Sequence, residues 1–425
     1  MPGKVATFHP GPLRGDVGVP GDKSISHRAL IVGARCAAPL RIANLNPGRD
    51  VQATRRALIA LGVGISEVGG DVVVRPARLR SPDATLDCMN SGSTARMLLG
   101  ACSGANVAAR FDGDASLRRR PMEPVAAQLR AFGAKIETSN GHLPLELSGT
   151  PEVETRRFIL LAPSAQVKSA LLFAGLFAGV PVRVDGDRGS RDHTERLLDY
   201  LGARIEWTSR FAELSTAALA SRDVAVAGDV SAAAFFVTAA AITPGSAITV
   251  RDVGVNPLRT GLFDALRAMG ASIELSDERL RCGEPLADVA VEYRPLTAAP
   301  IGADLALRAI DEIPLLAVAA AFATGTTTID GIGDLRSKES DRVAAIERLL
   351  AAVGTRSVIE RHRLAIVGGT TTSPGALVAT HDDHRIAMAA AVLGCAAGPL
   401  AIDDDESLDV SFPGFMAALE RLRDV

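Results

Sequence analysis

The sequence contains few aromatic residues. Phe, Trp and Tyr make up 4% of the 425 residues, with a single Trp, so the chain offers few rings on which nucleic-acid bases could stack. The formal net charge of −3 gives no electrostatic argument for a nucleic acid or an acidic membrane as a partner. No apolar run approaches the length of a membrane span, and the first residues lack the apolar core of a signal peptide. We therefore expect no nucleic-acid or membrane partner, and the cytoplasm as the compartment.

The cysteines are scattered and odd in number, and no two of them form a CxxC pair. This spacing argues against a disulfide framework and against a zinc site, so buried free thiols are the expected state. The five positions are Cys36, Cys88, Cys102, Cys282 and Cys395.

The chain is long for one hydrophobic core, which favours two domains, and it contains a repeated pattern of helices. One class of segment is an amphipathic helix that ends at a glycine, the residue expected just past the last helical turn. The closing glycines recur roughly every 70 to 85 residues, the scale of a supersecondary unit. These segments are residues 50–62, 120–133, 192–202, 256–270 and 340–354, with a sixth helix at 412–422.

A second class of segment starts with polar residues and continues as a nearly all-apolar, alanine-rich helix. Helices that are apolar on every side are expected inside a domain. Short β-branched runs between the two classes, such as residues 72–76 and 247–253, indicate strands. Six units follow, which suit two domains of three units each. The apolar helices are expected in residues 22–36, 90–104, 164–179, 229–243, 311–325 and 381–398.

Positive charges stand at the starts of these helices, where the partial positive charge of the helix dipole makes them unfavourable unless an anion lies nearby. Any single one is readily explained as a solvated surface charge. As a set they predict a site for several phosphate or carboxylate groups, because breaches of local rules gather at functional sites. The residues are Arg28, Arg96, Arg120, Lys168, Arg191, Arg342 and Arg385.

Nine motifs along the whole chain resemble, in order and spacing, those of the EPSP synthase family. GDKSISHRAL (residues 21–30) is similar to the Lys-Ser…Arg segment near the start of that family, and NSGSTAR (residues 90–96) is similar to its Asn-x-Gly-Thr…Arg segment. The others are GDASLRRRPM, SAQVKSALL, SRDHTER, GDVSAAAFF, IDEIPLLAVAAAFA, RSKESDR and DHRIAMA. The related UDP-N-acetylglucosamine enolpyruvyl transferases fit less well. They begin with Lys-Asn where this chain has Lys23-Ser24, and they carry a cysteine in the loop before Arg120-Pro121 that is absent here.

The resemblance implies an α/β fold of two similar domains, each of three βαβαββ repeats around buried parallel helices (an inside-out α/β barrel). Residues 1–21 and 230–425 would form one discontinuous domain and residues 22–229 the other, with the active site in the cleft between them. The implied reaction transfers the enolpyruvyl group of phosphoenolpyruvate to the 5-hydroxyl of shikimate 3-phosphate, without a cofactor or metal. It is an addition–elimination step of the shikimate pathway to chorismate and the aromatic amino acids. The competing interpretations are the UDP-N-acetylglucosamine enzyme, a non-catalytic repeat-built binding protein, and an inactive member.

Catalytic roles carried over by the resemblance fall on three residues. Asp311 would accept the hydroxyl proton, Glu339 would protonate the methylene carbon, and Lys23 would hold phosphoenolpyruvate and share the proton traffic. Simpler explanations exist for the two acids. Asp311 and Glu312 precede a helix start, where a carboxylate is favourable as a cap, and Glu339 could form an ordinary surface ion pair. His27 and His193 are expected to be structural.

The resemblance also implies two sets of binding residues. Arginine suits both, because its planar fork binds carboxylate or phosphate through two hydrogen bonds. The phosphoenolpyruvate set is Lys23, Gly92, Arg120, Gln166, Arg342, His384 and Arg385. The shikimate 3-phosphate set is Lys23, Ser24, Arg28, Ser164, Ala165, Gln166, Ser190, Arg191, Asp311 and Lys338. Asn90 and Arg96 would support them.

This chain departs from the family pattern at two positions. Ala165 stands where many relatives have a second serine, and Val410 stands where some have a lysine, so one phosphate hydrogen bond and one cation are in question. Gly92, which would let the backbone approach the ligand, predicts sensitivity to glyphosate, a competitor of phosphoenolpyruvate in this family. A monomer is the simpler expectation.

Overall fold

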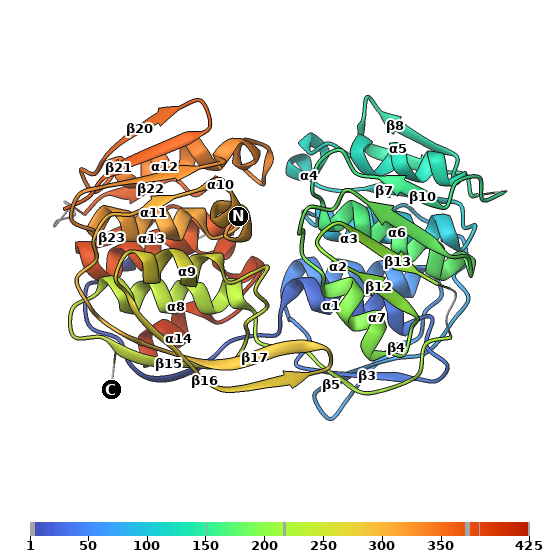
Figure 1. Cartoon of the computed structure of the whole chain (residues 1–425), viewed down its shortest axis with the longest axis horizontal. Coiled ribbons are helices and arrows are strands. Elements are labelled where there is room, and N and C mark those ends of the chain that lie inside the picture. Colours follow the sequence, from blue (N-terminus) through green and yellow to red (C-terminus); the bar gives the residue numbers. More distant parts are fainter. Residues whose placement is uncertain (1–4, 151, 216–217, 370–374, 382, 424–425) are drawn as a thin grey trace. The chain divides into compact units, whose positions relative to one another are not determined.

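The computed structural model describes residues 5–150, 152–215, 218–369, 375–381 and 383–423. The chain forms two compact units (Figure 1). Unit 1 comprises Met1–Pro20, Gly228–Arg279 and Pro285–Val425, and unit 2 comprises Gly21–Ala227 and Leu280–Glu284. The expected division kept residues 230–425 together, whereas the structure assigns Leu280–Glu284 to unit 2. The reason is local packing, because Arg196 donates from Nη1 to the carbonyl of Gly283 at 3.3 Å.

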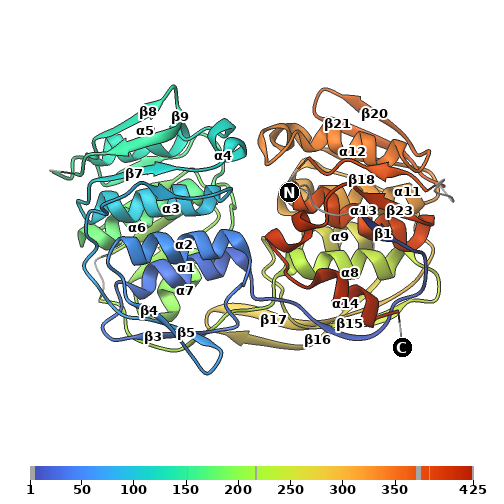
Figure 2. The same ribbon diagram turned by 180° about the vertical axis from the view of Figure 1, so that it is seen from behind.

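The interior of unit 2 consists of the apolar helices α1 (Lys23–Gly33), α3 (Gly92–Gly104) and α6 (Ala165–Ala178). Helices α3 and α6 lie next to each other (Figure 2). Small residues let two of these backbones touch. A β-carbon at Gly100 would lie 2.1 Å from the carbonyl oxygen of Ala170, so alanine could not replace this glycine without moving a helix. The predicted buried helices of this unit are confirmed.

Three small sheets and the amphipathic helices surround these helices within the described part of unit 2. Each sheet contains one parallel pair and an antiparallel hairpin, in the orders β14-β3-β5-β4, β6-β7-β9-β8 and β10-β11-β13-β12. The strands are β3 (Leu40–Ala43), β4 (Ile65–Val68), β5 (Asp71–Val74), β6 (Leu86–Asp87), β7 (Ala109–Asp112), β8 (Ile136–Ser139), β9 (His142–Leu147), β10 (Arg157–Ile159), β11 (Val182–Asp185), β12 (Ile205–Trp207), β13 (Phe211–Leu214) and β14 (Val224–Ala225). The remaining helices are α2 (Arg49–Ala60), α4 (Ala115–Arg119), α5 (Glu123–Phe132) and α7 (His193–Tyr200).

Unit 1 repeats this plan around the apolar helices α8 (Val230–Ile242), α11 (Ile313–Phe322) and α13 (His384–Ala397). Its sheets have the orders β16-β17-β15-β2, β18-β19-β21-β20 and β1-β23-β22. In the last sheet the N-terminal strand β1 pairs antiparallel with β23 in place of a hairpin, so the sixth repeat is completed by the other end of the chain.

The described strands of unit 1 are β1 (Ala6–Phe8), β2 (Arg14–Gly18), β15 (Ala247–Gly254), β16 (Ser272–Arg281), β17 (Glu284–Glu292), β18 (Pro300–Ile301), β19 (Thr326–Asp330), β20 (Arg356–Glu360), β21 (Arg363–Val367), β22 (Leu377–Val378) and β23 (Leu400–Ile402). Its other helices are α9 (Gly261–Ala268), α10 (Ala303–Arg308), α12 (Arg342–Ala351) and α14 (Phe415–Arg421), with 3-10 turns η1 (Ile332–Ser337) and η2 (Glu406–Val410).

None of the described helices is both long and apolar enough to cross a membrane. The same part of the chain holds no group of three or more His, Cys, Asp or Glu side chains that could bind a metal ion. The cysteines are free, and four of the five are buried.

Candidate active site

The predicted site residues lie in or just before the first two turns of helices, both the buried helices and the amphipathic α5, α7 and α12. Side-chain caps fix several of these helix starts: Asp22 accepts from the N–H of Ile25 at 2.9 Å, and Ser164 accepts from the N–H of Val167 at 3.3 Å. The residues fall into two groups according to their unit. The unit 2 cluster is Lys23, Ser24, Arg28, Asn90, Gly92, Arg96, Arg120, Ser164, Ala165, Gln166, Ser190 and Arg191. The unit 1 cluster is Asp311, Lys338, Glu339, Arg342, His384 and Arg385.

In the unit 2 cluster, Arg28 is a buried cation whose hydrogen-bond partners are neutral. Its side chain donates to Thr194 Oγ1 at 2.7 Å, to the Ser24 carbonyl at 2.8 Å and to Ser169 Oγ at 2.9 Å. Arg28 is 3% exposed, and among the described residues it forms no ion pair. Burial lowers the pKa of its guanidinium to about 10, although the charge of Glu195 opposes this shift. Carboxylates therefore act on this buried charge from a distance, but none of the described ones is in direct contact with it, so this position suits an anionic ligand.

A second part of the unit 2 cluster consists of two groups of hydrogen bonds. Arg96 Nη1 donates to Gln166 Oε1 at 2.7 Å, and Gln166 Nε2 donates to Ser93 Oγ at 3.0 Å. These bonds join α3 to α6. Arg120 Nη2 donates to Asn90 Oδ1 at 2.7 Å, which joins the segment before α5 to the segment before α3.

Gly92 lies against these guanidinium groups. A β-carbon added there would be 2.5 Å from Arg96 Nη1 and 3.4 Å from Arg120 Nη1. The space beside Gly92 is therefore taken by arginine side chains. Close packing against these arginines therefore explains the glycine. The sequence interpretation explained it only by the approach of the backbone to a ligand.

Lys23 is ion-paired. Its Nζ lies 2.8 Å from Asp50 Oδ2, and both side chains are partly exposed. Asp50, in the first turn of α2, was not singled out in the sequence, because nothing in its local pattern distinguishes it from an ordinary helix-start carboxylate.

Ser190 lies in a network that the sequence analysis missed. Its hydroxyl donates to Asp187 Oδ1, and Asp187 Oδ2 lies 2.8 Å from Lys168 Nζ. Lys168 also lies 2.6 Å from Glu195. The pattern of charged helix starts grouped Lys168 with the anion-binding cations, but its side chain is 1% exposed and pairs with these two carboxylates.

In the unit 1 cluster, three cations surround Asp311. Lys338 Nζ lies 3.3 Å and Arg342 Nη1 3.6 Å from Asp311 Oδ1, and Arg385 Nη2 lies 3.9 Å from Oδ2. Helix α11 begins at Ile313 with no side-chain capping bond from Glu312. Asp311 thus lies among three cations of the predicted set.

Arg342 holds the centre of this cluster. It contacts Asp383 through Nε at 2.9 Å and Nη2 at 3.2 Å, and Nη2 lies 2.5 Å from Glu339 Oε2. Burial acts to lower the pKa of Arg342, but Asp383, Glu339 and Asp311 outweigh it and raise this pKa. Burial likewise acts to raise the pKa of Asp383, and Arg342 holds it below its usual value. The Nε and Nη2 groups of Arg342 therefore donate to carboxylates of the protein.

Arg385 is held from both sides. Its Nη1 donates to the carbonyl of Asp311 at 3.0 Å and to Glu312 Oε1 at 3.2 Å, and its Nη2 donates to Ser231 Oγ at 3.3 Å. Ser231 and Glu312 are buried and were not predicted as site residues. His384, the first residue of α13, is buried beside Arg385.

The histidines that were left out of the predicted site are buried in networks of their own. His27 Nδ1 lies 2.7 Å from Thr54 Oγ1, and His193 Nδ1 lies 2.8 Å from Glu284 Oε1. Of the two departures from the family pattern, Ala165 is the first residue of α6 and Val410 the last of η2. Helix α13 is capped by Asp383, whose carboxylate accepts from the N–H of Arg385 at 3.0 Å.

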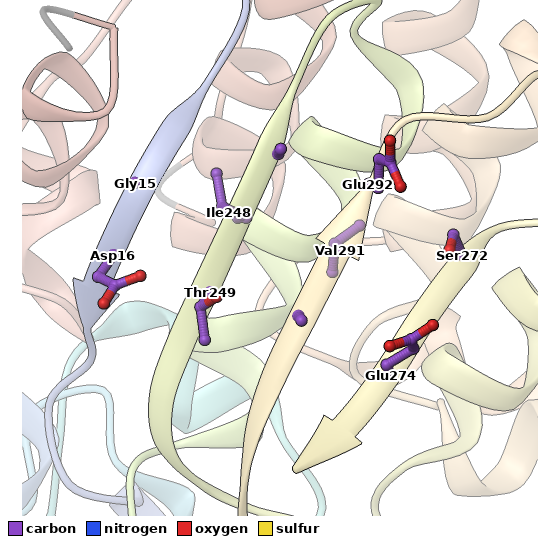
Figure 3. Close-up of a pocket in the computed structure, with 10 residues that line it drawn as sticks. Gly15, Asp16, Ile248, Thr249, Ser272, Glu274, Val291 and Glu292 are labelled. Carbon is purple, nitrogen blue, oxygen red and sulfur yellow. The ribbon is translucent and has the colours of Figure 1, made fainter.

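Three surface cavities lie elsewhere, and none of them is lined by a predicted site residue. One, of about 300 Å³, lies over strands β2, β15, β17 and β16 (Figure 3). It presents the carboxylates of Asp16, Glu274 and Glu292 without a lysine or arginine, which does not suit an anionic substrate. Cavities of about 250 and 620 Å³ lie at the C-terminal ends of the buried helices.

The fold is that of the enolpyruvyl transferases. An EPSP synthase structure from Acinetobacter baumannii matches this chain with a TM-score of 0.87 and 35% sequence identity, covering 99% of this chain and 98% of that one. The enolpyruvyl transferase NikO from Streptomyces tendae matches with a TM-score of 0.79 at 20% identity, over 99% and 98% of the two chains. Both likenesses agree with the expected fold class.

Sequence comparison narrows the assignment. The family model for EPSP synthase (3-phosphoshikimate 1-carboxyvinyltransferase) matches residues 8–419. A 3-phosphoshikimate 1-carboxyvinyltransferase from Anaeromyxobacter sp. (strain K) is 45% identical over 417 residues, covering 97% of this chain and 94% of the relative. One from Afipia carboxidovorans is 45% identical over 423 residues, covering 97% and 95%. The chain belongs to the EPSP synthase family.

Proposed function

We propose that this protein is a transferase that moves the enolpyruvyl group of phosphoenolpyruvate to the 5-hydroxyl of shikimate 3-phosphate. The products are 5-enolpyruvylshikimate 3-phosphate and phosphate. Family membership supports this activity, and one observation supports an anionic substrate directly. Arg28 is buried among neutral hydrogen-bond partners, so a phosphate or carboxylate would supply the missing negative charge.

The proposed chemistry needs an acid and a base on either side of the reacting carbons. Asp311 accepts the proton of the 5-hydroxyl of shikimate 3-phosphate. At the same time, the oxygen of that hydroxyl bonds to the substituted carbon of phosphoenolpyruvate. Glu339 donates a proton to the methylene carbon, which becomes a methyl group in a tetrahedral ketal phosphate. The carbon–oxygen bond to phosphate then breaks, a methyl proton returns to a base, and the enol ether forms. Lys23 holds phosphoenolpyruvate and shares in these transfers.

The ion pair between Glu339 and Arg342, at 2.5 Å, bears on this sequence of steps. A guanidinium next to a carboxyl group favours its ionised form, which accepts protons and does not donate them. We infer that the anionic groups of phosphoenolpyruvate take over Arg342 and release Glu339 to become the acid. Binding of the substrate would then prepare its own proton donor.

The remaining residues would bind the two substrates as the family pattern implies. Arg120, Gln166, His384 and Arg385 would join Gly92, Lys23 and Arg342 around phosphoenolpyruvate. Ser24, Arg28, Ser164, Ala165, Gln166, Ser190, Arg191, Asp311 and Lys338 would bind shikimate 3-phosphate with Lys23. In this proposal residues of both clusters act on one substrate pair.

Phosphate release from purified protein tests the proposal. We expect release with phosphoenolpyruvate and shikimate 3-phosphate together, and none when UDP-N-acetylglucosamine replaces shikimate 3-phosphate. Release with the nucleotide sugar alone would keep the chemistry and overturn the acceptor. No release with either would favour a binding protein or an inactive member. A monomer and a cytoplasmic location remain part of the proposal, and light scattering after gel filtration tests the first.

A further inference from the structure

Unit 2 contains a buried cation that lies close to the proposed substrate site but is not directed to a ligand. Lys168 Nζ lies 2.8 Å from Asp187 Oδ2 and 2.6 Å from Glu195 Oε1, and each of the three side chains is at most 2% exposed. The same Nζ lies 3.4 Å from the carbonyl oxygen of Ser190. Burial acts to lower the pKa of Lys168, but the two carboxylates outweigh it and raise this pKa, so the ammonium stays charged.

These contacts join three segments that carry proposed shikimate 3-phosphate residues. Lys168 belongs to α6, one turn beyond Ser164. Asp187 belongs to the turn that ends at Ser190, whose hydroxyl donates to the Asp187 carboxylate. Glu195 belongs to the first turn of α7, where its neighbour Thr194 accepts a hydrogen bond from Arg28. One ammonium group therefore fixes α6, the turn and α7 relative to one another within unit 2.

The turn needs such support because its backbone is unusual. Gly186, Arg188 and Gly189 have φ values of 82°, 50° and 80°, and a non-glycine residue at positive φ is uncommon. Conformations of this kind persist when the surrounding structure holds them in place. The bonds from Lys168 to the carboxylate of Asp187 and to the carbonyl of Ser190 lie on both sides of Arg188 and Gly189.

Stability alone is a weak explanation for this group. Taking three charged side chains out of water is costly, and well-packed apolar residues of similar volume are often as stable or more so. A buried ionic group can instead hold one conformation against others, which a site for a phosphate group requires. Ser190 and Arg191 must be held in place together if they are to bind one phosphate.

We propose that Lys168 is a positioning residue for shikimate 3-phosphate: through Asp187 and Glu195 it holds Ser190 and Arg191 where they bind the substrate phosphate. Lys168 does not touch the substrate. This inference rests on the function proposed above. It predicts that loss of the network weakens the affinity for shikimate 3-phosphate and leaves the affinity for phosphoenolpyruvate nearly unchanged.

The single tryptophan offers a binding signal that needs no turnover. Trp207 Nε1 donates to Asp192 Oδ2 at 3.4 Å, and Asp192 is the N-cap of α7, directly after Arg191. Fluorescence of Trp207, checked by titration calorimetry, therefore reports on shikimate 3-phosphate at this segment.

The experiment compares Asp187→Asn, Lys168→Met and a control, Arg183→Met. Asp187→Asn keeps the Lys168–Glu195 pair and weakens the link to the turn, so it is the milder change. Arg183 is also a cation between two carboxylates of unit 2, Asp185 at 3.0 Å and Glu213 at 2.6 Å, but its side chain is 30% exposed and no proposed site residue depends on it. Thermal unfolding followed by circular dichroism identifies the variants that fold.

We expect the dissociation constant and KM for shikimate 3-phosphate to rise about fivefold or more in Asp187→Asn and about tenfold or more in Lys168→Met. The KM for phosphoenolpyruvate should change less than about twofold, and Arg183→Met should match the parent protein. A purely structural role would reduce the folded fraction without changing the affinity of folded molecules. Folded variants with unchanged shikimate 3-phosphate affinity, or with equal losses for both substrates, overturn the proposal.

Two further outcomes have definite meanings. If Lys168→Met does not fold, the shikimate 3-phosphate affinity of Asp187→Asn alone tests the proposal. Unchanged affinity in the folded Asp187→Asn variant then overturns it. If the parent protein neither binds shikimate 3-phosphate nor releases phosphate with it, the proposed function fails, and the positioning role of Lys168 toward that substrate fails with it. An active parent with unaltered variants removes only the inference about Lys168.

Discussion

Replacing Gly92 by alanine would displace the side chain of Arg96 at the start of α3 by a distance that follows from the structure. The new β-carbon would lie 2.5 Å from Arg96 Nη1, and ordinary contact begins at 3.4 Å, so the guanidinium must retreat by about 0.9 Å (3.4 − 2.5). Its bond to Gln166 Oε1 measures 2.7 Å and would lengthen to as much as about 3.6 Å, beyond hydrogen-bond range. A bond from a charged donor contributes about 1.5–3 kcal/mol, which corresponds to roughly ten- to hundredfold in affinity.

The loss of affinity should be larger for phosphoenolpyruvate than for shikimate 3-phosphate. Gly92 and Arg120 belong to the phosphoenolpyruvate set alone, whereas Gln166 belongs to both sets. We expect the glyphosate concentration that halves the rate to rise at least about tenfold in Gly92→Ala, and the KM for phosphoenolpyruvate to rise with it. Shikimate 3-phosphate binding should change less, because Arg28 keeps its contacts. Phosphate-release rates over a range of glyphosate concentrations measure the first effect, and Trp207 fluorescence measures the second.

A glycine in open space provides the control for Gly92→Ala. An added β-carbon at Gly18 would meet nothing within 4 Å, so Gly18→Ala should leave both measurements unchanged. If Gly92→Ala shows the inhibition of the parent protein, or loses shikimate 3-phosphate affinity to the same extent, the reasoning from Arg96 and Gln166 is refuted.

Three other substitutions test separate parts of the site, and a fourth tests a buried histidine. Asp311→Asn and Glu339→Gln should each lower turnover by about 10²–10⁴-fold. Shikimate 3-phosphate should still bind to the Glu339 variant. If turnover of that variant stays within about threefold of the parent, Glu339 forms an ordinary ion pair and is not the acid. Arg28→Gln should raise the KM for shikimate 3-phosphate about tenfold or more without lowering the unfolding temperature, because it removes a buried charge; a loss of stability with unchanged KM would contradict the assignment. Burial lowers the pKa of His27 from 6.5 to about 3, so between these pH values the unfolded chain binds a proton that the folded chain does not. Stability should fall by about 2 kcal/mol through this group from pH 6.5 to pH 5, and urea unfolding of His27→Gln should lack that part of the decline.

Periodicity was enough to predict the elements that position the site. Helices such as α8 and α11 are apolar on every side, and that pattern can be satisfied only in an interior. The glycines that close the amphipathic helices were predicted for the same kind of local reason, and Gly133 indeed takes the left-handed conformation at the end of α5. The fold class and family followed from such local patterns and from motif order.

Partners far apart in the sequence could not be predicted in this way. Nothing near Lys168 shows that Asp187 and Glu195 neutralise it, and a cation at a helix start has the same local pattern whether it faces a ligand or a carboxylate. Glu312 has the sequence context of a cap, yet its carboxylate binds Arg385 and Ser231. The pairing of β1 with β23 likewise depends on segments at opposite ends of the chain.

The two clusters differ in whether a bound anion would have to displace a carboxylate of the protein. Arg28 in unit 2 has neutral partners, so an arriving anion displaces no counter-charge there. Arg342 in unit 1 already contacts Asp383 and Glu339, so an anion that binds it must compete with a carboxylate of the protein. Asp383 is fully buried and bonds along one edge of the guanidinium, whereas Glu339 is partly exposed and bonds to Nη2. In the proposed mechanism Glu339 is the carboxylate that an incoming phosphate or carboxylate replaces, and it is also the residue proposed to act in its protonated form. Substrate binding and preparation of the acid then become one event, because the same guanidinium serves both.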